Sequence, residues 1–221
     1  MNEQTTPALP NLLPEPTLRR LPWYLAYVSM LRQEGVEKVS SRRLAEDLAV
    51  DASQIAKDLS FIRIKGKTRI GYDVAELETA LQEFLGFAQC HNAVMVGAGS
   101  LGGALMCDSG LNHYGLNIVA GIDTDARVVN TRIKGIPVYP PSELPALVKR
   151  LGILIGIIAV PVEQAQDVAD NLVNAGIKAL WNFTPRRIRV KPGIVVSNTS
   201  IYSHLAVMYN RLANIETPRV Q

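Results

Sequence analysis

An apolar strand runs directly into a glycine-rich turn in the segment Val94-Met95-Val96-Gly97-Ala98-Gly99-Ser100-Leu101-Gly102-Gly103. The turn has the spacing GxGxxG, and each glycine has a mechanical reason. Gly97 allows the tight turn, Gly99 lets a pyrophosphate approach the backbone, and Gly102 lets the next helix pack closely on the strand. The first amides of that helix can face an anion. The segment therefore predicts the first strand, turn and helix of a Rossmann domain.

A carboxylate stands where such a domain holds the adenosine ribose. Asp123 follows the next apolar run, 118–122, about twenty residues after Gly102, as the motif requires. An acid at this position favours NAD over NADP, because a 2′-phosphate would meet a like charge. With this acid in place we favour a dinucleotide site over glycines that serve packing alone. Another adenine-containing ligand, such as coenzyme A, stays open as an alternative.

The segments after residue 88 alternate between two kinds of pattern. Strand-like apolar runs at 93–96, 117–122, 154–160, 179–183 and 194–197 are separated by helical segments at 101–110, 142–151 and 162–175. Strands that alternate with helices indicate a parallel sheet wound by right-handed crossovers, hence an α/β fold. The last periodic segment, 201–215, predicts a terminal helix whose own sheet partners are already accounted for. We expect that helix to pack elsewhere.

The first part of the chain has a different pattern. Residues 1–15 are proline-rich without periodicity and predict a flexible arm. Helical spacing then predicts a helix from Pro16 that stops at Gly35, a second helix over 42–48 and a third from Asp51 to Phe61. A basic hairpin over 62–73 and a linking helix over 74–85 follow. Three short helices and a basic hairpin are the pattern of a winged helix-turn-helix domain.

A basic stripe lies within this domain, in which Asp58 is the single acid among Lys57, Arg63, Lys65, Lys67 and Arg69. In a winged helix the third helix enters the major groove, so we expect Ser53, Gln54 and Lys57 to meet base edges or phosphates. Lys65, Lys67 and Arg69 in the wing would neutralise phosphates. Asp58 weakens the simple charge argument, and a partner within its own helix, Lys57 or Arg63, would explain it. A helical interaction module with solvated lysines is the alternative.

Composition sets the broad class. The chain has 221 residues, 48% of them apolar, and a net charge of +3, which indicates a globular protein with enough material for two domains. Neither a membrane-length apolar run nor a secretion signal is seen, so we expect a cytoplasmic protein without membrane association. Cys90 and Cys107 match no metal-ligand or CxxC spacing. We expect two reduced packing residues and no metal.

Catalysis is not favoured by the sequence. A dehydrogenase needs a proton donor or a carbonyl-polarising group near the nicotinamide, but His91, His113 and His204 are isolated. The nucleotide fold uses up the residues after the linker and leaves no second domain to hold a substrate. We therefore expect binding without turnover. An NAD-dependent oxidoreductase with an N-terminal helical appendage is the rival hypothesis.

Together these residues resemble the Rex family of redox-sensing repressors over about 14–212. The matching segments are PEPTLRRLP at 14–22, SS at 40–41, LA at 44–45, KDLS at 57–60, GK at 66–67, GYD at 71–73, GAGSLG at 97–102, DTD at 123–125, GIPV at 135–138, VP at 160–161, AGIK at 175–178 and NF at 182–183. The resemblance implies NAD(H) bound in the Rossmann domain and an operator released when NADH rises. It also implies homodimers that exchange the last helix.

The resemblance adds site residues to those read from the motifs. On the DNA side it adds Arg19, Arg20, Ser41 and Ser60, and on the nucleotide side Ala98, Ser100, Leu101, Val160, Pro161, Asn182 and Phe183. The expected domains are an arm at 1–15, a winged-helix domain at 16–88, a Rossmann domain at 89–199, and a swapped helix with its tail at 200–221.

The sequence also departs from the family pattern. Similar family members use an Arg on the first helix, a Tyr after the Rossmann helix and an Asp opening the last helix as a polar switch. The matching positions here are Ala26, Asp108 and Ser200. In the reader, Ala56 replaces an Arg and Phe61 a Tyr. Replacing a polar network as a set can be nearly neutral for stability. We therefore hypothesise that fold and pocket are kept while ligand and DNA are coupled differently.

Overall fold

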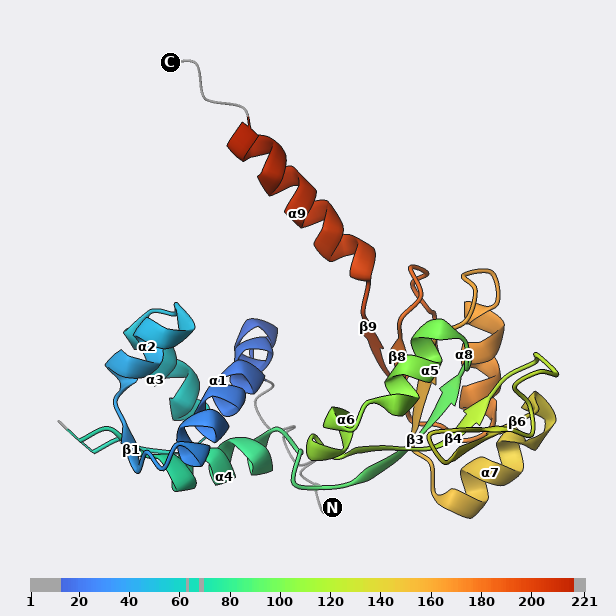
Figure 1. The fold of residues 1–221 in the computed structure, drawn as a ribbon, viewed down its shortest axis with the longest axis horizontal. Helices are drawn as coiled ribbons and strands as arrows, with labels where there is room; N and C mark the ends of the chain where they lie inside the picture. The colour runs from blue at the N-terminus through green and yellow to red at the C-terminus, as the bar shows by residue number, and fades with distance from the viewer. Residues whose placement is uncertain (1–12, 63, 68–69, 217–221) are drawn as a thin grey trace, which may run out of the picture. The chain divides into compact units, whose positions relative to one another are not determined.

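The structure is a computed structural model that describes residues 13–62, 64–67 and 70–216 (Figure 1). The chain divides into two compact units that meet between Gln89 and Cys90. Most of the expected arm, the wing positions Arg63, Thr68 and Arg69, and the end of the tail lie outside the described residues. No helix in the described part of the chain is long and apolar enough to cross a membrane.

The N-terminal unit contains the helices α1 (Glu15–Gln33), α2 (Ser41–Leu48), α3 (Ala52–Phe61) and α4 (Val74–Phe84). Side-chain caps fix where α2 and α3 begin, because the Ser40 hydroxyl accepts from the Arg43 amide and Asp51 accepts from the amides of Ser53 and Gln54. All four helices contribute to one core, with Leu21, Tyr24, Leu44, Ile55, Leu59 and Leu77 fully enclosed. The three predicted short helices and the linking helix are therefore present.

Where it is described, the segment after α3 contains the antiparallel bridge of a hairpin, between Lys67 and Gly71, and it also forms a strand pairing that was not predicted. Strand β2 (Tyr72–Asp73) pairs antiparallel with β1 (Lys38–Val39), which lies before α2. Lys67 and Gly71 exchange backbone hydrogen bonds. Gly71 has φ +90°, and a Cβ there would lie 2.2 Å from the Val39 carbonyl oxygen. The wing is thus anchored to the β1 strand through a position that only glycine fits.

The ion-pair partner of Asp58 is not the expected Lys57 but a residue of another helix, and the other expected partner, Arg63, lies outside the described residues. The buried Asp58 carboxylate pairs with Arg20 of α1, whose Nε lies 2.7 Å from Oδ2. Thr17, Tyr24 and Gln54 also donate to it, at 3.0, 2.8 and 2.8 Å. Long-range pairing was invisible in the sequence because Arg20 and Asp58 are far apart along the chain. The carboxylate fastens α1 to α3.

The C-terminal unit is built on a seven-stranded sheet of order β5-β6-β4-β3-β7-β8-β9. The strands are β3 (His91–Val96), β4 (Leu116–Ile122), β5 (Arg132–Ile133), β6 (Ile136–Tyr139), β7 (Ile155–Ile158), β8 (Ala179–Asn182) and β9 (Val195–Asn198). All neighbours pair in parallel except β5 with β6. The predicted parallel α/β sheet is confirmed. The β5–β6 hairpin was not predicted, since its strands are too short to give a periodic signal.

Helices cover both faces of this sheet. They are α5 (Ser100–Cys107), α6 (Gly110–His113), α7 (Leu144–Leu151) after the short helix η1 (Pro141–Glu143), and α8 (Ala165–Asn174). Alternate residues of β3 enter different cores: Val94 and Val96 pack with α7 and α8, whereas Met95 packs with Met106 of α5. The last helix, α9 (Ile201–Glu216), runs away from β9 and from the sheet (Figure 1).

The Asp58 contacts make the stability of the N-terminal unit depend on pH. Burial raises the pKa of Asp58, but hydrogen bonds from Arg20, Tyr24, Gln54 and Thr17 outweigh it and hold the pKa below its ordinary 3.8. The stability that this carboxylate contributes is therefore complete above the ordinary pKa and is lost as pH falls through the lowered one.

We expect Asp58→Asn to lower the free energy of unfolding at neutral pH by about 3 kcal/mol, because it leaves Arg20 without its charged partner. Urea denaturation across acidic pH checks this, and the gap between wild type and variant should narrow as pH falls below the ordinary pKa of Asp58. If the difference in free energy of unfolding between wild type and variant stayed constant down to about pH 2, the lowered pKa of Asp58 would not be the source of this stability.

Candidate functional site

The glycine-rich turn connects β3 to α5, and its glycines have different surroundings. A Cβ on Gly102 would lie 1.8 Å from the Gly97 carbonyl oxygen, and one on Gly97 would lie 2.4 Å from the Ala159 carbonyl oxygen. Both positions are thus required by backbone contacts within the unit. A Cβ on Gly99 would meet nothing within 4 Å. Gly99 is the glycine that faces open space, where an approaching phosphate needs it.

Asp123 ties the turn to the end of β4. Its Oδ2 accepts a hydrogen bond from the Ala98 amide at 2.7 Å, and its Oδ1 accepts one from the Asp125 amide at 2.9 Å. A carboxylate has about four acceptor sites, so capacity for ribose hydroxyls is left. The sequence predicted the ribose contact and missed the tie to Ala98, because a side-chain bond to a distant backbone amide leaves no pattern in the sequence.

A cavity of about 830 Å³ opens beside this turn. Gly97, Gly99 and Asp123 line one part of it, and η1, α7 and α8 form walls with residues that include Ser142, Pro145, Gln164 and Asn171. Val160 and Pro161, just after β7, also line it. The carboxyl ends of β3, β4 and β7 therefore meet at one hollow, which is where open α/β sheets bind ligands.

A second hollow of about 380 Å³ shares the lining residues Ala159, Val160 and Pro161 with the first. Leu101 and Phe183 line it, together with Ile201 and Tyr202 from the first turn of α9. Asn182 is not among its lining residues. The Asn182 side chain is buried and donates to the Arg186 carbonyl oxygen at 2.7 Å and to Asn198 at 2.9 Å. It shapes the loop that follows β8, and so places Phe183.

An ion pair stands next to Asp123. Arg127 contacts both oxygens of Asp125, with Nη2 2.6 Å from Oδ2 and Nε 3.0 Å from Oδ1. These hydrogen bonds lower the pKa of Asp125 to about 2. The Arg127 cation offsets the charge of Asp125, so this pair adds little to the repulsion that a 2′-phosphate would meet beside Asp123.

In the N-terminal unit, α3 presents one exposed face. Ser53, Ala56, Lys57 and Ser60 are exposed and follow the i, i+3, i+4, i+7 spacing of a single helix face. The Ser60 hydroxyl donates to the Lys57 carbonyl oxygen at 2.6 Å. Lys65 and Lys67 of the wing are also exposed, whereas Arg69 lies outside the described residues. The structure thus brings Ser53, Lys57 and Ser60 together, as a helix that enters a groove requires.

Two of the residues expected to contact DNA have partners within the N-terminal unit. The Gln54 amide group donates to Asp58, and the Arg20 guanidinium pairs with the same carboxylate. Gln54 is half-buried and does not share the exposed face with Lys57. Arg19 is exposed and pairs with Glu15, and Ser41 opens α2. The sequence could not separate Gln54 from Lys57, because both lie within one turn of α3.

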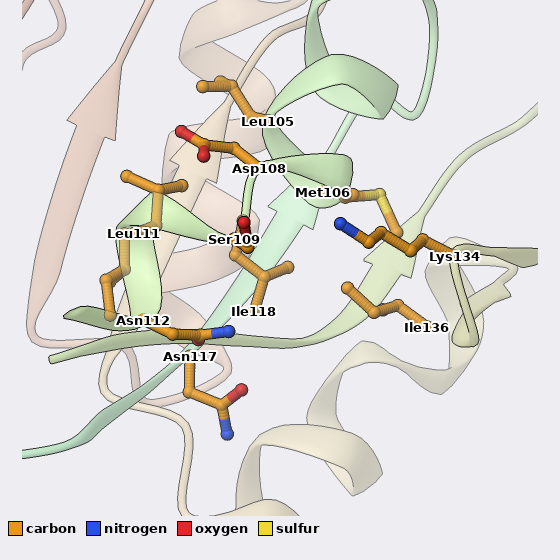
Figure 2. Close-up of a pocket in the computed structure, with 11 residues that line it drawn as sticks. Leu105, Met106, Asp108, Ser109, Leu111, Asn112, Asn117, Ile118, Lys134 and Ile136 are labelled. Atoms are coloured by element: carbon orange, nitrogen blue, oxygen red, sulfur yellow. The ribbon is translucent and has the colours of Figure 1, made fainter. Parts of the chain in front are cut away.

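The three altered switch positions lie in unlike surroundings. Asp108 lines a cavity of about 210 Å³ between α5, α6 and β4, and its Oδ1 accepts from the Gly110 amide at 2.7 Å. In Figure 2 Lys134 lies across this cavity from Asp108, and its Nζ donates to the Cys107 carbonyl oxygen. The Ser200 hydroxyl accepts from the Ser203 amide in the first turn of α9, and Ala26 is exposed on α1. Within the described residues of one chain, Asp108 forms no ion pair.

Comparisons with known proteins find matches to both units of the chain. Residues 13–60 match the family model described as putative DNA-binding protein N-terminus, and residues 89–186 match the CoA binding domain model. A redox-sensing transcriptional repressor Rex from Porphyromonas gingivalis is 53% identical over 94% of this chain and 95% of its own length. The repressor of the same name from Bacteroides fragilis is 51% identical over 96% of each chain.

Solved structures give the same result over nearly the whole chain. The crystal structure of RSP in complex with beta-NAD+ and operator DNA is similar with a TM-score of 0.88 and 33% identity, covering 94% of this chain and 95% of RSP. RSP in complex with beta-NADH is similar with a TM-score of 0.85 over 94% and 97%. RSP is described as a Rex-family repressor. From its sequence identity and from the extent of these matches, the chain belongs to the Rex family of redox-sensing transcriptional repressors.

Proposed function

We propose that this chain is a transcriptional repressor that binds operator DNA through residues 16–88 and NAD(H) through residues 89–199, and that the redox state of the nicotinamide alters its hold on DNA. One observation carries the proposal: a single chain combines a glycine turn that opens onto a cavity with an exposed helix face followed by a basic wing. The similarity to a repressor solved with beta-NAD+ and operator DNA supports both halves.

The dinucleotide would lie across the two adjoining hollows. Gly99 leaves room for the pyrophosphate at the N-terminus of α5, where the amides of Ser100 and Leu101 are at the positive end of the helix. Asp123 would accept from the adenosine ribose in the larger cavity. The nicotinamide would then enter the smaller hollow, between Leu101 and Phe183.

The smaller hollow offers a physical route from the ligand to α9. Ile201 and Tyr202 belong to the first turn of α9 and line the place proposed for the nicotinamide. A ligand can shift a conformational equilibrium only through a difference in affinity for the two states. A change of ring shape and charge beside Ile201 and Tyr202 supplies such a difference at the base of α9.

The exposed apolar surface of α9 supports a homodimer. Its large apolar side chains are between 50% and 65% exposed, at Ile201, Tyr202, Val207, Met208, Tyr209 and Leu212. Contiguous apolar surface of this kind marks an interaction site. A second copy of the chain, each copy extending its α9 onto the other, would cover both helices by one symmetric exchange.

The positions of the histidines favour binding over turnover. His91 opens β3 and His113 ends α6 just before β4, so both lie at the amino-terminal edge of the sheet, opposite the glycine turn. His204 lies on α9 and is exposed. The relatives are named repressors. We therefore propose that the nucleotide acts as a signal, and steady consumption of NADH with a panel of small carbonyl compounds would argue for the oxidoreductase instead.

The central test is DNA binding titrated with each nucleotide separately. On duplex DNA from upstream of its own gene, we expect NADH to weaken binding more than NAD+ does, by about fivefold, the lower end of common allosteric couplings. A small factor is expected because Ala26, Asp108 and Ser200 replace the charged and aromatic switch residues. A gel shift or fluorescence anisotropy measures it. Equal effects of the two nucleotides would remove redox sensing, since a ligand with no preference shifts no equilibrium.

Two glycine variants separate the ligand site from the fold. Gly99→Ala adds a methyl group into open space, so the protein should keep its melting temperature and lose NADH affinity by about tenfold or more. Gly102→Ala pushes a Cβ against the Gly97 carbonyl oxygen and should destabilise the Rossmann unit by about 3 kcal/mol. Thermal unfolding and NADH fluorescence titration check both. If both variants lost the same NADH affinity and both kept the wild-type melting temperature, Gly99 and Gly102 would not have the different roles assigned to them.

A charge on α9 tests the homodimer. Met208→Asp places a carboxylate within the surface proposed to be covered by the partner, which should weaken the dimer by about 2 kcal/mol or more. Ala146→Asp adds the same charge on the exposed side of α7 and should leave assembly unchanged. Light scattering over a concentration series measures the masses. A Met208→Asp protein as dimeric as Ala146→Asp would exclude α9 from the interface.

A further inference from the structure

Two buried carboxylates in the N-terminal unit each hold an arginine of α1. Asp58 of α3 pairs with Arg20, and Glu78 of α4 pairs with Arg32. Their relative exposures are 0% and 7%. The two sites are chemically alike, since each carboxylate also accepts a hydroxyl hydrogen bond from α1, from Thr17 or from Ser29. They differ in their neighbours, because only Asp58 lies on the helix that presents Ser53, Lys57 and Ser60.

The Asp58 carboxylate fixes the plane of the Arg20 guanidinium. Nε donates to Oδ2 at 2.7 Å and Nη2 donates to Oδ1 at 2.9 Å, two parallel bonds of the fork type. The carboxylate is itself held, because Tyr24 donates to Oδ2 at 2.8 Å and Thr17 to Oδ1 at 3.0 Å. Neither group can rotate without breaking several hydrogen bonds at once.

One end of the guanidinium is left over. The bonds of Arg20 use Nε and Nη2, and Nη1 has no partner among the described residues. The Arg20 side chain is 25% exposed. A phosphate that met Nη1 would lie on the side of the guanidinium away from Asp58, so its attraction to the cation exceeds its repulsion by the carboxylate.

The same carboxylate sets the direction of Gln54. Gln54 lies one turn before Asp58 on α3, and its amide group donates to Oδ1 of Asp58 at 2.8 Å. Gln54 could otherwise offer its amide to adenine edges, the contact for which glutamine is suited. Asp58 therefore decides which side chains at the start of α3 are offered to a partner.

We propose that Asp58 is a positioning residue for DNA recognition: it holds Arg20 beside α3 as a phosphate clamp with Nη1 free, and it keeps Gln54 off the exposed face. The proposal rests on the DNA binding proposed above. An arginine that is ordered before binding loses little further side-chain freedom when it meets a phosphate. Asp58 itself contacts no DNA and acts through Arg20 and Gln54.

Salt dependence is the readout that a merely structural role would not move. Each neutralised phosphate adds about 0.9 to the slope of log K against log salt concentration. With the full-length protein at a temperature where all variants are folded, Asp58→Asn should weaken DNA binding about tenfold, the size of a charge-assisted contact, and reduce the slope by about 0.9. In an Arg20→Ala background the same substitution should change the slope no further.

Glu78→Gln is the matched control. It removes the charge of the other buried carboxylate that holds α1, so it should destabilise the unit while leaving affinity and slope at the wild-type values. An equal slope change in Glu78→Gln, or an unchanged slope in Asp58→Asn, would show that Asp58 only fastens helices together.

Two further outcomes are separable. If Asp58→Asn does not fold by circular dichroism, Thr17→Ala replaces it, since the Thr17 hydroxyl contacts both Asp58 and Arg20; its slope should fall in the same direction and an unchanged slope overturns the proposal. A wild-type protein that binds NADH but ignores duplex DNA at low salt contradicts the proposed function itself. By contrast, if the wild type binds DNA and Asp58→Asn binds it with the same affinity and salt slope, only the role of Asp58 is contradicted.

Discussion

The close backbone approach between Gly97 and Gly102 is the constraint on which the nucleotide site depends. With no side chain at either position, only three residues separate the end of β3 from the start of α5. Its free amides then lie at the carboxyl edge of the sheet, where β4 delivers Asp123 and β7 delivers Val160 and Pro161. A methyl group at Gly102 would push the helix away and misplace all of these at once.

Local patterns predicted most of the fold, and they did so where one physical cause dominated. Apolar runs gave the strands of the parallel sheet, and the side chains of Ser40 and Asp51 fixed the starts of two helices. The GxGxxG spacing and Asp123 predicted which edge of the sheet binds the ligand. The β5–β6 hairpin was not predicted, because strands of only a few residues are too short to show a periodic pattern in the sequence. The pairing of the wing with β1 was also not predicted, since it joins segments on either side of two helices.

The candidate sites were predictable only at the level of residue type. Asp123 was predicted to accept from a ribose, and its bond to the Ala98 amide could not be predicted because it depends on the folded backbone. Lys57 and Gln54 looked equivalent in sequence, but the Gln54 side chain donates to Asp58 whereas Lys57 is exposed. Burial and long-range hydrogen bonding decide such cases, and neither can be read from spacing along a helix.

The bare apolar surface of α9 links the stability of the molecule to its abundance. If two chains must cover each other's helices, the folded state is favoured by mass action, and its free energy of unfolding has no value independent of protein concentration. Dilution then acts as a destabiliser. A cell that makes little of this protein would hold more of it as monomers with uncovered helices, and so more open to proteolysis and to association with unrelated apolar surfaces.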